Sequence, residues 1–272
     1  MYSIFHNIAQ QVAQKLKESE FFMKVSISQS KVEMGKKAAA CGAEYIRKAI
    51  AEKGVANIVL ACAPSQNRTY DALIEEQGID WSKVRVFHLD EYIGLDDKHP
   101  ASFRLNLHKT ILDRLPQQVQ QFFPIEGDAA DIDKVIDELD REIKKCKIDV
   151  AFVGIGENGH VAFNDPPADF DIEKAYLTAA LDEVCRHQQY GEGWFPTMDA
   201  VPKYAVTMSC KQIMSAAVIV NTVPDTRKAK AVKMSLEGPI SNMVPATIMR
   251  NHDNYNVFLD AEAAALLENK YE

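Results

Sequence analysis

The sequence has few cysteines and no pair of them spaced as C-x-x-C. Its five cysteines are an odd number, scattered over 272 residues. Disulfide frameworks and most cysteine-rich metal sites instead use closely spaced sets of cysteines, usually even in number. We therefore predict reduced thiols, mostly buried as small hydrophobic side chains, in an intracellular protein.

Long hydrophobic runs are also absent. No stretch approaches the roughly 18 consecutive apolar residues that a transmembrane helix needs. The N-terminal segment lacks a positive region followed by an apolar one, so no secretory signal peptide is expected. Repeats, low-complexity tracts and Ser/Gly-rich linkers are missing as well, and no domain boundary is drawn within 1–272. These absences predict a single cytoplasmic domain.

Positive charge is in short supply. Lys plus Arg is 31 and Asp plus Glu is 39, so the formal net charge is −8. Binding to nucleic-acid phosphates needs a positive face, and so does binding to an anionic membrane surface; we expect neither partner. A basic residue in a pocket would be a local exception to this overall negative charge. The apolar share of 47% is typical of globular proteins and excludes a wholly disordered chain.

Short apolar segments alternate with longer amphipathic ones along the chain. The short segments predict buried strands, and the longer ones predict helices with one apolar face. The predicted strands are 23–28, 57–62, 84–89, 148–155, 205–209, 217–223 and 256–259. The predicted helices are 3–19, 31–53, 69–76, 131–145 and 226–237. This alternation favours parallel strand pairing, and therefore an α/β fold with a sheet covered by helices.

One stretch, 164–203, is less regular than the rest of the chain. It is rich in Pro, Asp, Gln and Gly, and it shows no clear helical or strand period. Long loops within compact domains often act as lids or binding loops. We therefore expect a lid at about 164–200 that carries Arg186.

Polar clusters follow four of the predicted strands. Ligands of open parallel sheets bind beyond the carboxyl ends of the strands, so each cluster is a candidate site. The first is the turn Ser65-Gln66-Asn67, after the strand 57–62. Its side chains, together with free N–H groups at a helix start, favour an anion such as phosphate. A plain helix cap is the alternative.

Two acids, Asp90 and Glu91, directly follow the strand 84–89. Side chains at this point lie where ligand and solvent meet, although a carboxylate pair that caps a helix is the structural alternative. His88 and Asp90 are residue types that bind metals, but no further ligand set with a recognisable spacing is present. No metal site is therefore predicted.

A literal G-x-G-x-x-G occurs at 154–159, after a predicted strand. In dinucleotide-binding proteins this motif opens a helix whose N-terminus meets the pyrophosphate. Here Pro166-Pro167 would soon stop such a helix, so no nicotinamide or flavin cofactor is predicted. The alternative is a glycine loop that presents His160 to a cavity. Asp165 would then meet the imidazole, as in general acid–base pairs.

Basic residues form the last cluster. Arg186 lies in the irregular stretch, and Lys228 lies beside Arg227 at the start of the helix 226–237. This helix follows a predicted strand, so its first residues lie at a carboxyl end. Cations there suit an anionic substrate, although a solvated surface charge is the usual role of any one of them.

Taken in order, several motifs resemble the glucosamine-6-phosphate deaminase (isomerase) family. They are D-E-Y-x-G-L from Asp90, G-x-G-x-N-G-H-x-x-F-N from Gly154, V-P-K-Y-A-V-T from Val201 and R-K-A from Arg227. The first two are specific in combination, and the resemblance runs from about residue 55 to the C-terminus. It implies one α/β domain with a Rossmann-like, mostly parallel sheet covered by helices on both faces. It implies no cofactor and no metal.

The family reaction converts an amino-sugar 6-phosphate and water to fructose 6-phosphate and ammonia. By resemblance, His160 opens the sugar ring and Asp90 moves the C2 proton to C1. Asp165 stands where the family usually has Glu beside the histidine, and Asn158 stands where some members have Asp. The residues that correspond to phosphate contacts are Lys228, Arg186 and the turn Ser65, Gln66 and Asn67.

Departures from the family pattern leave the amino-sugar epimer open. The phosphate turn has no glycine, and Asp165 is one methylene shorter than Glu. The stretch from Gln188 to Phe195 also looks longer than in typical members. The expected partner is a small-molecule sugar phosphate. Assembly into a homo-oligomer stays open.

Two other functions remain as alternatives. The related 6-phosphogluconolactonases share the glycine–histidine element and hydrolyse a lactone, but Phe163-Asn164-Asp165 and Tyr92 favour the deaminase type. A non-catalytic sugar-phosphate sensor is the second alternative. The presence of both Asp90 and His160 argues against it.

Overall fold

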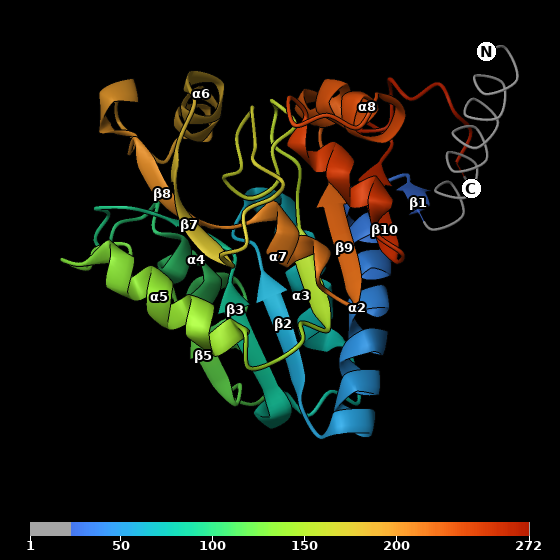
Figure 1. The fold of residues 1–272 in the computed structure, drawn as a ribbon. Coiled ribbons are helices and arrows are strands. Elements are labelled where there is room, and N and C mark those ends of the chain that lie inside the picture. Colours follow the sequence, from blue (N-terminus) through green and yellow to red (C-terminus); the bar gives the residue numbers. More distant parts are fainter. Residues whose placement is uncertain (1–22, 272) are drawn as a thin grey trace, which may run out of the picture.

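Two sheets organise the chain in the computed structural model, which describes residues 23–271 (Figure 1). The larger sheet has seven parallel strands in the order β1-β10-β9-β6-β2-β3-β5, and the smaller has three antiparallel strands in the order β4-β8-β7. The strands are β1 (Met23–Ser28), β2 (Ala56–Leu60), β3 (Val84–His88), β4 (Asp90–Tyr92), β5 (Gln121–Phe123), β6 (Val150–Val153), β7 (Tyr176–Ala180), β8 (Tyr204–Met208), β9 (Val218–Val223) and β10 (Tyr255–Asp260).

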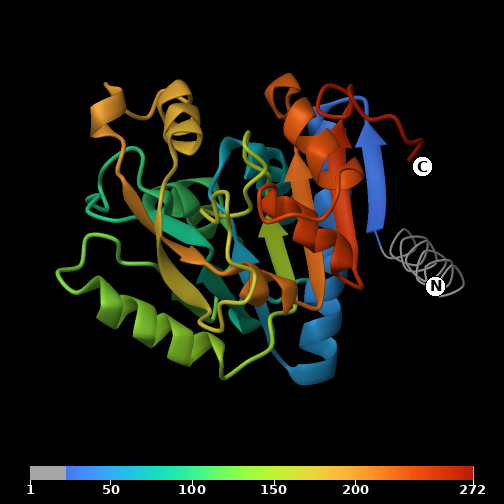
Figure 2. The same ribbon diagram turned by 45° about the horizontal axis from the view of Figure 1, so that its top comes forward.

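Helices cover both faces of the seven-stranded sheet, as predicted (Figures 1 and 2). The α-helices are α2 (Lys31–Lys53), α3 (Asn67–Glu75), α4 (Phe103–Thr110), α5 (Ile132–Ile143), α6 (Glu183–Gly191), α7 (Cys210–Met214) and α8 (Ala229–Glu237). Successive strand side chains point to opposite faces. In β2, Ile58 and Leu60 belong to the core shared with α2, α3 and α4, whereas Val59 belongs to the core shared with α5, α7 and α8. The sheet therefore separates two hydrophobic cores.

The helix α2 packs closely against the sheet. Ser30 caps its start by accepting from the N–H of Glu33, and Gly54 ends it with φ of 75°. A Cβ at Gly42 would come within 2.2 Å of Cζ of Phe152, so glycine allows the helix to approach β6. None of the helices in residues 23–271 is long and apolar enough to cross a membrane.

Most predicted elements within residues 23–271 are confirmed, and two differ. The helix predicted at 3–19 lies outside the described residues and stays a prediction. The strand predicted at 205–209 forms, but as β8 it pairs antiparallel in the smaller sheet. The stretch predicted to be irregular contains β7 and α6. Only Cys185 and Gln189 of α6 are buried, so this helix leaves little hydrophobic period in the sequence.

All five cysteines are free thiols, as predicted. Cys185 and Cys210 are buried, whereas the other three are partly exposed. The expectation that most are buried is therefore wrong for this chain.

Candidate active site

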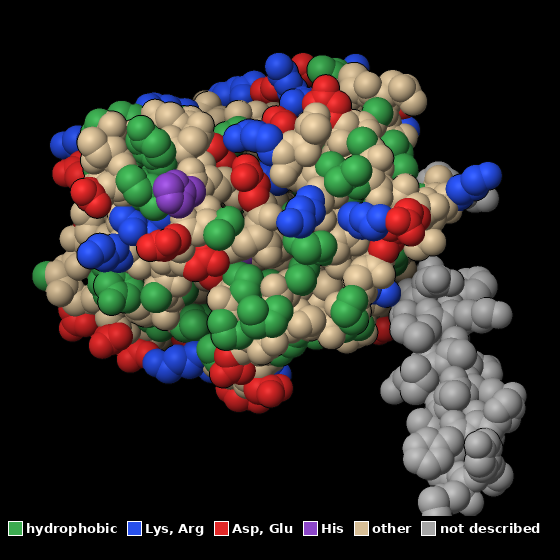
Figure 3. Space-filling model, turned by 90° about the horizontal axis from the view of Figure 1, so that it is seen from above, with side chains coloured by type: hydrophobic (Ala, Val, Ile, Leu, Met, Phe, Trp, Pro, Cys, Tyr) green, Lys and Arg blue, Asp and Glu red, His purple; other side chains and the backbone are tan. Residues whose placement is uncertain are grey.

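A pocket lies at the carboxyl edge of the seven-stranded sheet. Residues that follow four strands line it: Ser65 after β2, Asp90 after β3, His160 after β6 and Lys228 after β9. Parallel pairing of β2 with β3 and β6 brings these strand ends together. The prediction that these three strands share one pocket at their carboxyl ends is confirmed. Figure 3 views this end of the molecule, where basic and acidic side chains lie intermixed.

The loop 154–159 presents His160 to the pocket. No helix begins at its glycines, so the geometry that a dinucleotide-binding motif requires does not form. Gly156 lies against the imidazole, because a Cβ there would come within 2.1 Å of Nε2 of His160. Gly159 has φ of 85°, which glycine adopts without strain. The two glycines thus allow the loop to place the imidazole of His160.

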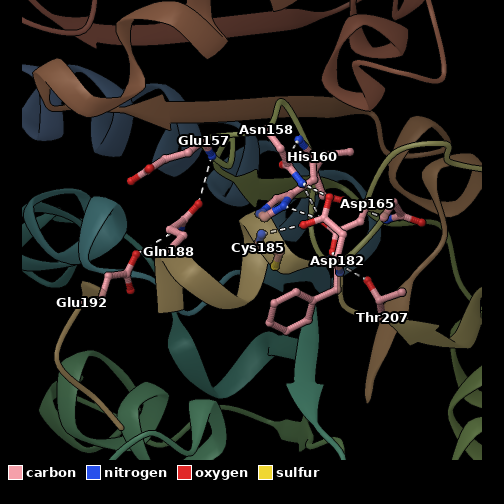
Figure 4. A network of polar contacts seen from close by, with 12 residues as sticks. Glu157, Asn158, His160, Asp165, Asp182, Cys185, Gln188, Glu192 and Thr207 are labelled. Carbon is pink, nitrogen blue, oxygen red and sulfur yellow. Dashed lines mark hydrogen bonds and ion pairs between the residues drawn. The ribbon is translucent and has the colours of Figure 1, made fainter. Parts of the chain in front are cut away.

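Asp165 meets the imidazole, as the sequence predicted (Figure 4). Its Oδ1 lies 2.7 Å from Nδ1 of His160 and accepts from Nδ2 of Asn158 at 2.9 Å. Its Oδ2 accepts from the N–H of Asp182 at 3.0 Å. Burial acts to raise the pKa of Asp165, but the hydrogen bonds from His160 and Asn158 outweigh it and hold this pKa below its ordinary value.

Asn158 joins both partners of this pair. Its Oδ1 accepts from the N–H of His160 at 3.0 Å, while its Nδ2 also reaches Oδ2 of Asp182 at 3.0 Å. Asn158 is therefore a positioning residue without charge. Within residues 23–271 no group bonds to Nε2 of His160, which is left for a ligand.

Asp90 is the first residue of β4, where it pairs with Thr207 of β8. Its carboxyl lines the pocket although the residue is only 6% exposed, and no described residue donates a hydrogen bond to it. Burial and then the charge of Glu91 raise the pKa of Asp90 well above its ordinary value. An unbonded carboxyl of this kind is suited to carry a proton.

Glu91 has the structural role that the sequence left as an alternative. Its carboxylate accepts from the N–H groups of Phe103 and Arg104 and from the hydroxyl of Ser102, at the start of α4. Burial raises the pKa of Glu91 to about 6, against the opposing effect of these donors. The two adjacent acids therefore serve different purposes.

The three residues of the predicted phosphate turn are placed differently. Ser65 lines the pocket. Gln66 is fully buried, and its Nε2 donates to the carbonyls of Val153 and Thr222 at 3.1 and 3.3 Å, which joins β6 to β9. Asn67 is exposed and lines a neighbouring hollow. Phosphate contacts by Gln66 and Asn67 stay predictions.

The two basic residues also differ. Lys228 lies in the pocket and is 7% exposed, with no carboxylate of residues 23–271 within 4.0 Å of its ammonium group. Burial lowers the pKa of Lys228, against the charges of Glu192 and Glu157. Arg186 instead donates from Nη2 to the carbonyls of Met198 and Val201, at 2.9 and 3.1 Å. A phosphate contact by Arg186 requires this segment to move, and it stays a prediction.

Comparison with known proteins places this site in a family. The model of glucosamine-6-phosphate isomerases and 6-phosphogluconolactonases matches residues 29–258. The chain belongs to this family. The glucosamine-6-phosphate deaminase of Oenococcus oeni is 34% identical to it, over 91% of this chain and 100% of the relative. That of Thermoanaerobacter sp. (strain X514) is 32% identical, over 90% and 95%.

Solved structures of the family agree with the fold. A monomeric glucosamine-6-phosphate deaminase has a TM-score of 0.82 and 30% identity, over 90% of this chain and 100% of that chain. A putative 6-phosphogluconolactonase from Neisseria gonorrhoeae has a TM-score of 0.70 and 19% identity, over 88% and 99%. This family member is thus more similar to the deaminase in both sequence and structure.

In this family member, α6 adds pocket residues that the sequence analysis missed. Gln188, Gln189 and Glu192 all line the pocket. Oε1 of Gln188 accepts from the N–H of Glu157 at 2.9 Å, and Figure 4 shows Gln188 between Glu157 and Glu192. The sequence signal for these residues was the unusual length of the stretch from 188 to 195. Length alone does not show which of its side chains reach the pocket.

One group of metal-binding residue types occurs in residues 23–271 of this family member. Potential ligand atoms of His160, Asp165 and Cys185 lie within 4.8 Å of one another. Burial raises the pKa of the Cys185 thiol, which opposes the thiolate that a metal would need. His88 is fully buried in β3, where burial lowers its pKa to about 3, and it forms no such group with Asp90.

Proposed function

We propose that this family member is an amino-sugar-6-phosphate deaminase. It converts glucosamine 6-phosphate, or an epimer, and water to a ketohexose 6-phosphate and ammonia. One observation carries the proposal: a single pocket holds His160, which Asp165 contacts at Nδ1, together with the carboxyl of Asp90 and the ammonium group of Lys228, neither of which has a partner within residues 23–271. The relatives named glucosamine-6-phosphate deaminase support it.

Ring opening falls to His160. Asp165 remains a carboxylate and stabilises the imidazolium through Nδ1, so the proton on Nε2 faces the pocket. Delivered to the ring oxygen, this proton allows the bond between C1 and that oxygen to break. The imidazole, neutral once it has given up its proton, takes the proton of the C1 hydroxyl, and the open-chain aldehyde results. Imidazole is suited to this step because it can both donate and accept a proton.

Proton transfer from C2 to C1 falls to Asp90. Burial and the charge of Glu91 disfavour the carboxylate of Asp90, so base catalysis requires a ligand that favours this ionised form. An ammonium group on C2 does so, because a nearby opposite charge favours the ionised form. A lactone carries no such cation. When the C2 proton has moved to C1 and one ammonium proton has passed to the C1 oxygen, C2 carries an iminium group. Water adds to this carbon and ammonia leaves, which gives the ketohexose phosphate.

The phosphate on C6 is bound by Lys228 and Ser65. An anchor distant from the reacting carbons supplies binding energy that positions the substrate. The segment at about 164–200 acts as the lid, and Arg186 reaches the phosphate when the lid closes. In the structure α6, which belongs to this segment, lies over the pocket, where Oε1 of Gln188 accepts from the N–H of Glu157.

The test is ammonia release from glucosamine 6-phosphate, measured beside hydrolysis of 6-phosphogluconolactone. We expect ammonia and a ketohexose 6-phosphate, with no lactone hydrolysis above background. Lactone hydrolysis without ammonia release would instead establish the lactonase alternative. Binding of amino-sugar phosphates without turnover would establish the sensor.

A further inference from the structure

The proposed mechanism leaves part of the pocket unused. Asp90 and His160 serve C1, C2 and the ring oxygen, while Lys228 binds the phosphate on C6. The middle of the sugar, with its hydroxyl groups on C3 and C4, has no partner among these residues. Gln189 and Glu192 line the same pocket from α6 and its C-terminal cap.

Gln189 presents a hydrogen-bond donor. The residue is 5% exposed, and its Oε1 accepts from the hydroxyl of Tyr92 at 2.6 Å, which orients the amide. No acceptor in residues 23–271 bonds to its Nε2. A largely buried amide donor without a partner costs free energy unless a ligand or water binds it.

Glu192 presents an acceptor. Its carboxylate accepts one hydrogen bond, from Nε2 of Gln188 at 3.1 Å, and no cation of residues 23–271 lies within 4.0 Å. Glu192 caps the C-terminus of α6, where the negative end of the helix dipole disfavours a carboxylate. The charge of Lys228 partly offsets this cost, although no cation is paired with Glu192 within residues 23–271.

The helix that carries both groups already lies over the pocket in the structure. Arg186 ties it to the carbonyls of Met198 and Val201, and Gln188 ties it to the N–H of Glu157. Gln189 and Glu192 are three residues apart, so they are neighbours on the surface of the helix.

We infer that Gln189 and Glu192 bind the hydroxyl groups on C3 and C4 and thereby select the hexosamine epimer. A hydroxyl both donates and accepts, so an amide donor beside a carboxylate acceptor matches it. Inverting C3 or C4 moves the hydroxyl away and leaves the two side chains without a partner. The inference rests on the proposed function.

The experiment compares kcat/KM for ammonia release from glucosamine 6-phosphate, its C4 epimer galactosamine 6-phosphate and its C3 epimer allosamine 6-phosphate. Glu192→Gln keeps the shape and removes the charge. The double variant Gln189→Glu with Glu192→Gln exchanges donor and acceptor at constant net charge. Glu183→Gln, an exposed position on the same helix outside the pocket, is the matched control.

We expect both pocket variants to change the ratio of kcat/KM between epimers by about tenfold or more, the size of one charged hydrogen bond. Glu183→Gln should leave the ratio unchanged. Equal losses on all three substrates, with the ratio constant within about twofold, would overturn the inference and leave the deaminase standing. A wild-type protein that releases ammonia from none of the three would overturn the proposed function as well.

Discussion

The two sheets supply opposite kinds of chemistry to one pocket. The seven-stranded sheet provides an imidazole and an ammonium group, His160 and Lys228, in segments that directly follow β6 and β9. The three-stranded sheet provides the carboxyl of Asp90 from β4, and α6, after β7, adds Gln189 and Glu192. An amino-sugar phosphate, with an anion at one end and a cation at the other, suits this division.

The two sheets also position their residues by different means. The parallel strands end, and the following loops turn back over the edge of the sheet, as at His160. In β4 the antiparallel pairing with β8 continues, so successive side chains point to opposite faces. Asp90 therefore faces the pocket while Glu91 caps α4. Pairing, and not residue type, decides which of two adjacent acids faces the pocket.

Substitution of Asp90 should lower turnover most, because it removes the carboxyl group that the three-stranded sheet supplies. Asp90→Asn keeps the shape and removes the base, so we expect turnover to fall by about 10²–10⁴-fold. Incorporation of solvent deuterium at C2 should be lost in parallel, as NMR of the sugar phosphate would report. Retained deuterium incorporation would place the base elsewhere.

Substitution of His160 tests the other side at the reacting end. His160→Gln should lose about 10²-fold or more on glucosamine 6-phosphate, and less on an open-chain analogue that cannot cyclise. The activity of Asp165→Asn should lie between those of this variant and wild type, because Asp165 only orients and charges the imidazole. Steady-state kinetics on both substrates provide the test, and equal losses on both would show that His160 does not specialise in ring opening.

Substitution of Lys228 tests the residues that bind the phosphate. Lys228→Ala should raise KM by about 10–100-fold and lower kcat much less, since the anchor binds ground state and transition state alike. Ser65→Ala should show a smaller effect of the same kind. An unchanged KM for the phosphorylated sugar after Lys228→Ala would remove this lysine from the site.

Substitution of Glu91 tests its structural role through stability. Glu91→Gln should lower the free energy of unfolding by about 1–3 kcal/mol, because the amide leaves N–H donors of α4 without an acceptor. The folded chain binds the Glu91 proton more tightly than the unfolded chain. The stability gained when Glu91 binds its proton is therefore full below pH 4.5 and is lost as pH rises through about 6. Denaturant unfolding across this range should show the dependence in wild type and not in the variant.

The smallest effect concerns the lid at about 164–200. Sugar phosphate should slow amide hydrogen exchange in α6, because closure adds contacts from Arg186 and the pocket residues. The exchange of β2 and β6 should stay unchanged and serves as the internal control. Equal exchange in α6 with and without sugar phosphate would argue against a lid.

The sequence was sufficient for features that depend on local pattern. Buried strands such as 57–62 and 84–89 show as short apolar runs, and their alternation with helices implied parallel pairing and a pocket at the carboxyl ends. The contact between His160 and Asp165 was predictable because only a short turn separates them. These features need few contacts from distant parts of the chain.

The tertiary structure alone decided features that depend on a partner. The strands β4 and β5 are three residues long, too short to carry a period, and they form because β8 and β3 offer open edges. Ser65, Gln66 and Asn67 are adjacent and chemically alike, yet one faces the pocket, one joins two strands and one lies at the surface. Their directions follow from the packing of β2 beside β6, because a sequence gives the order of side chains and only distant contacts fix where they point.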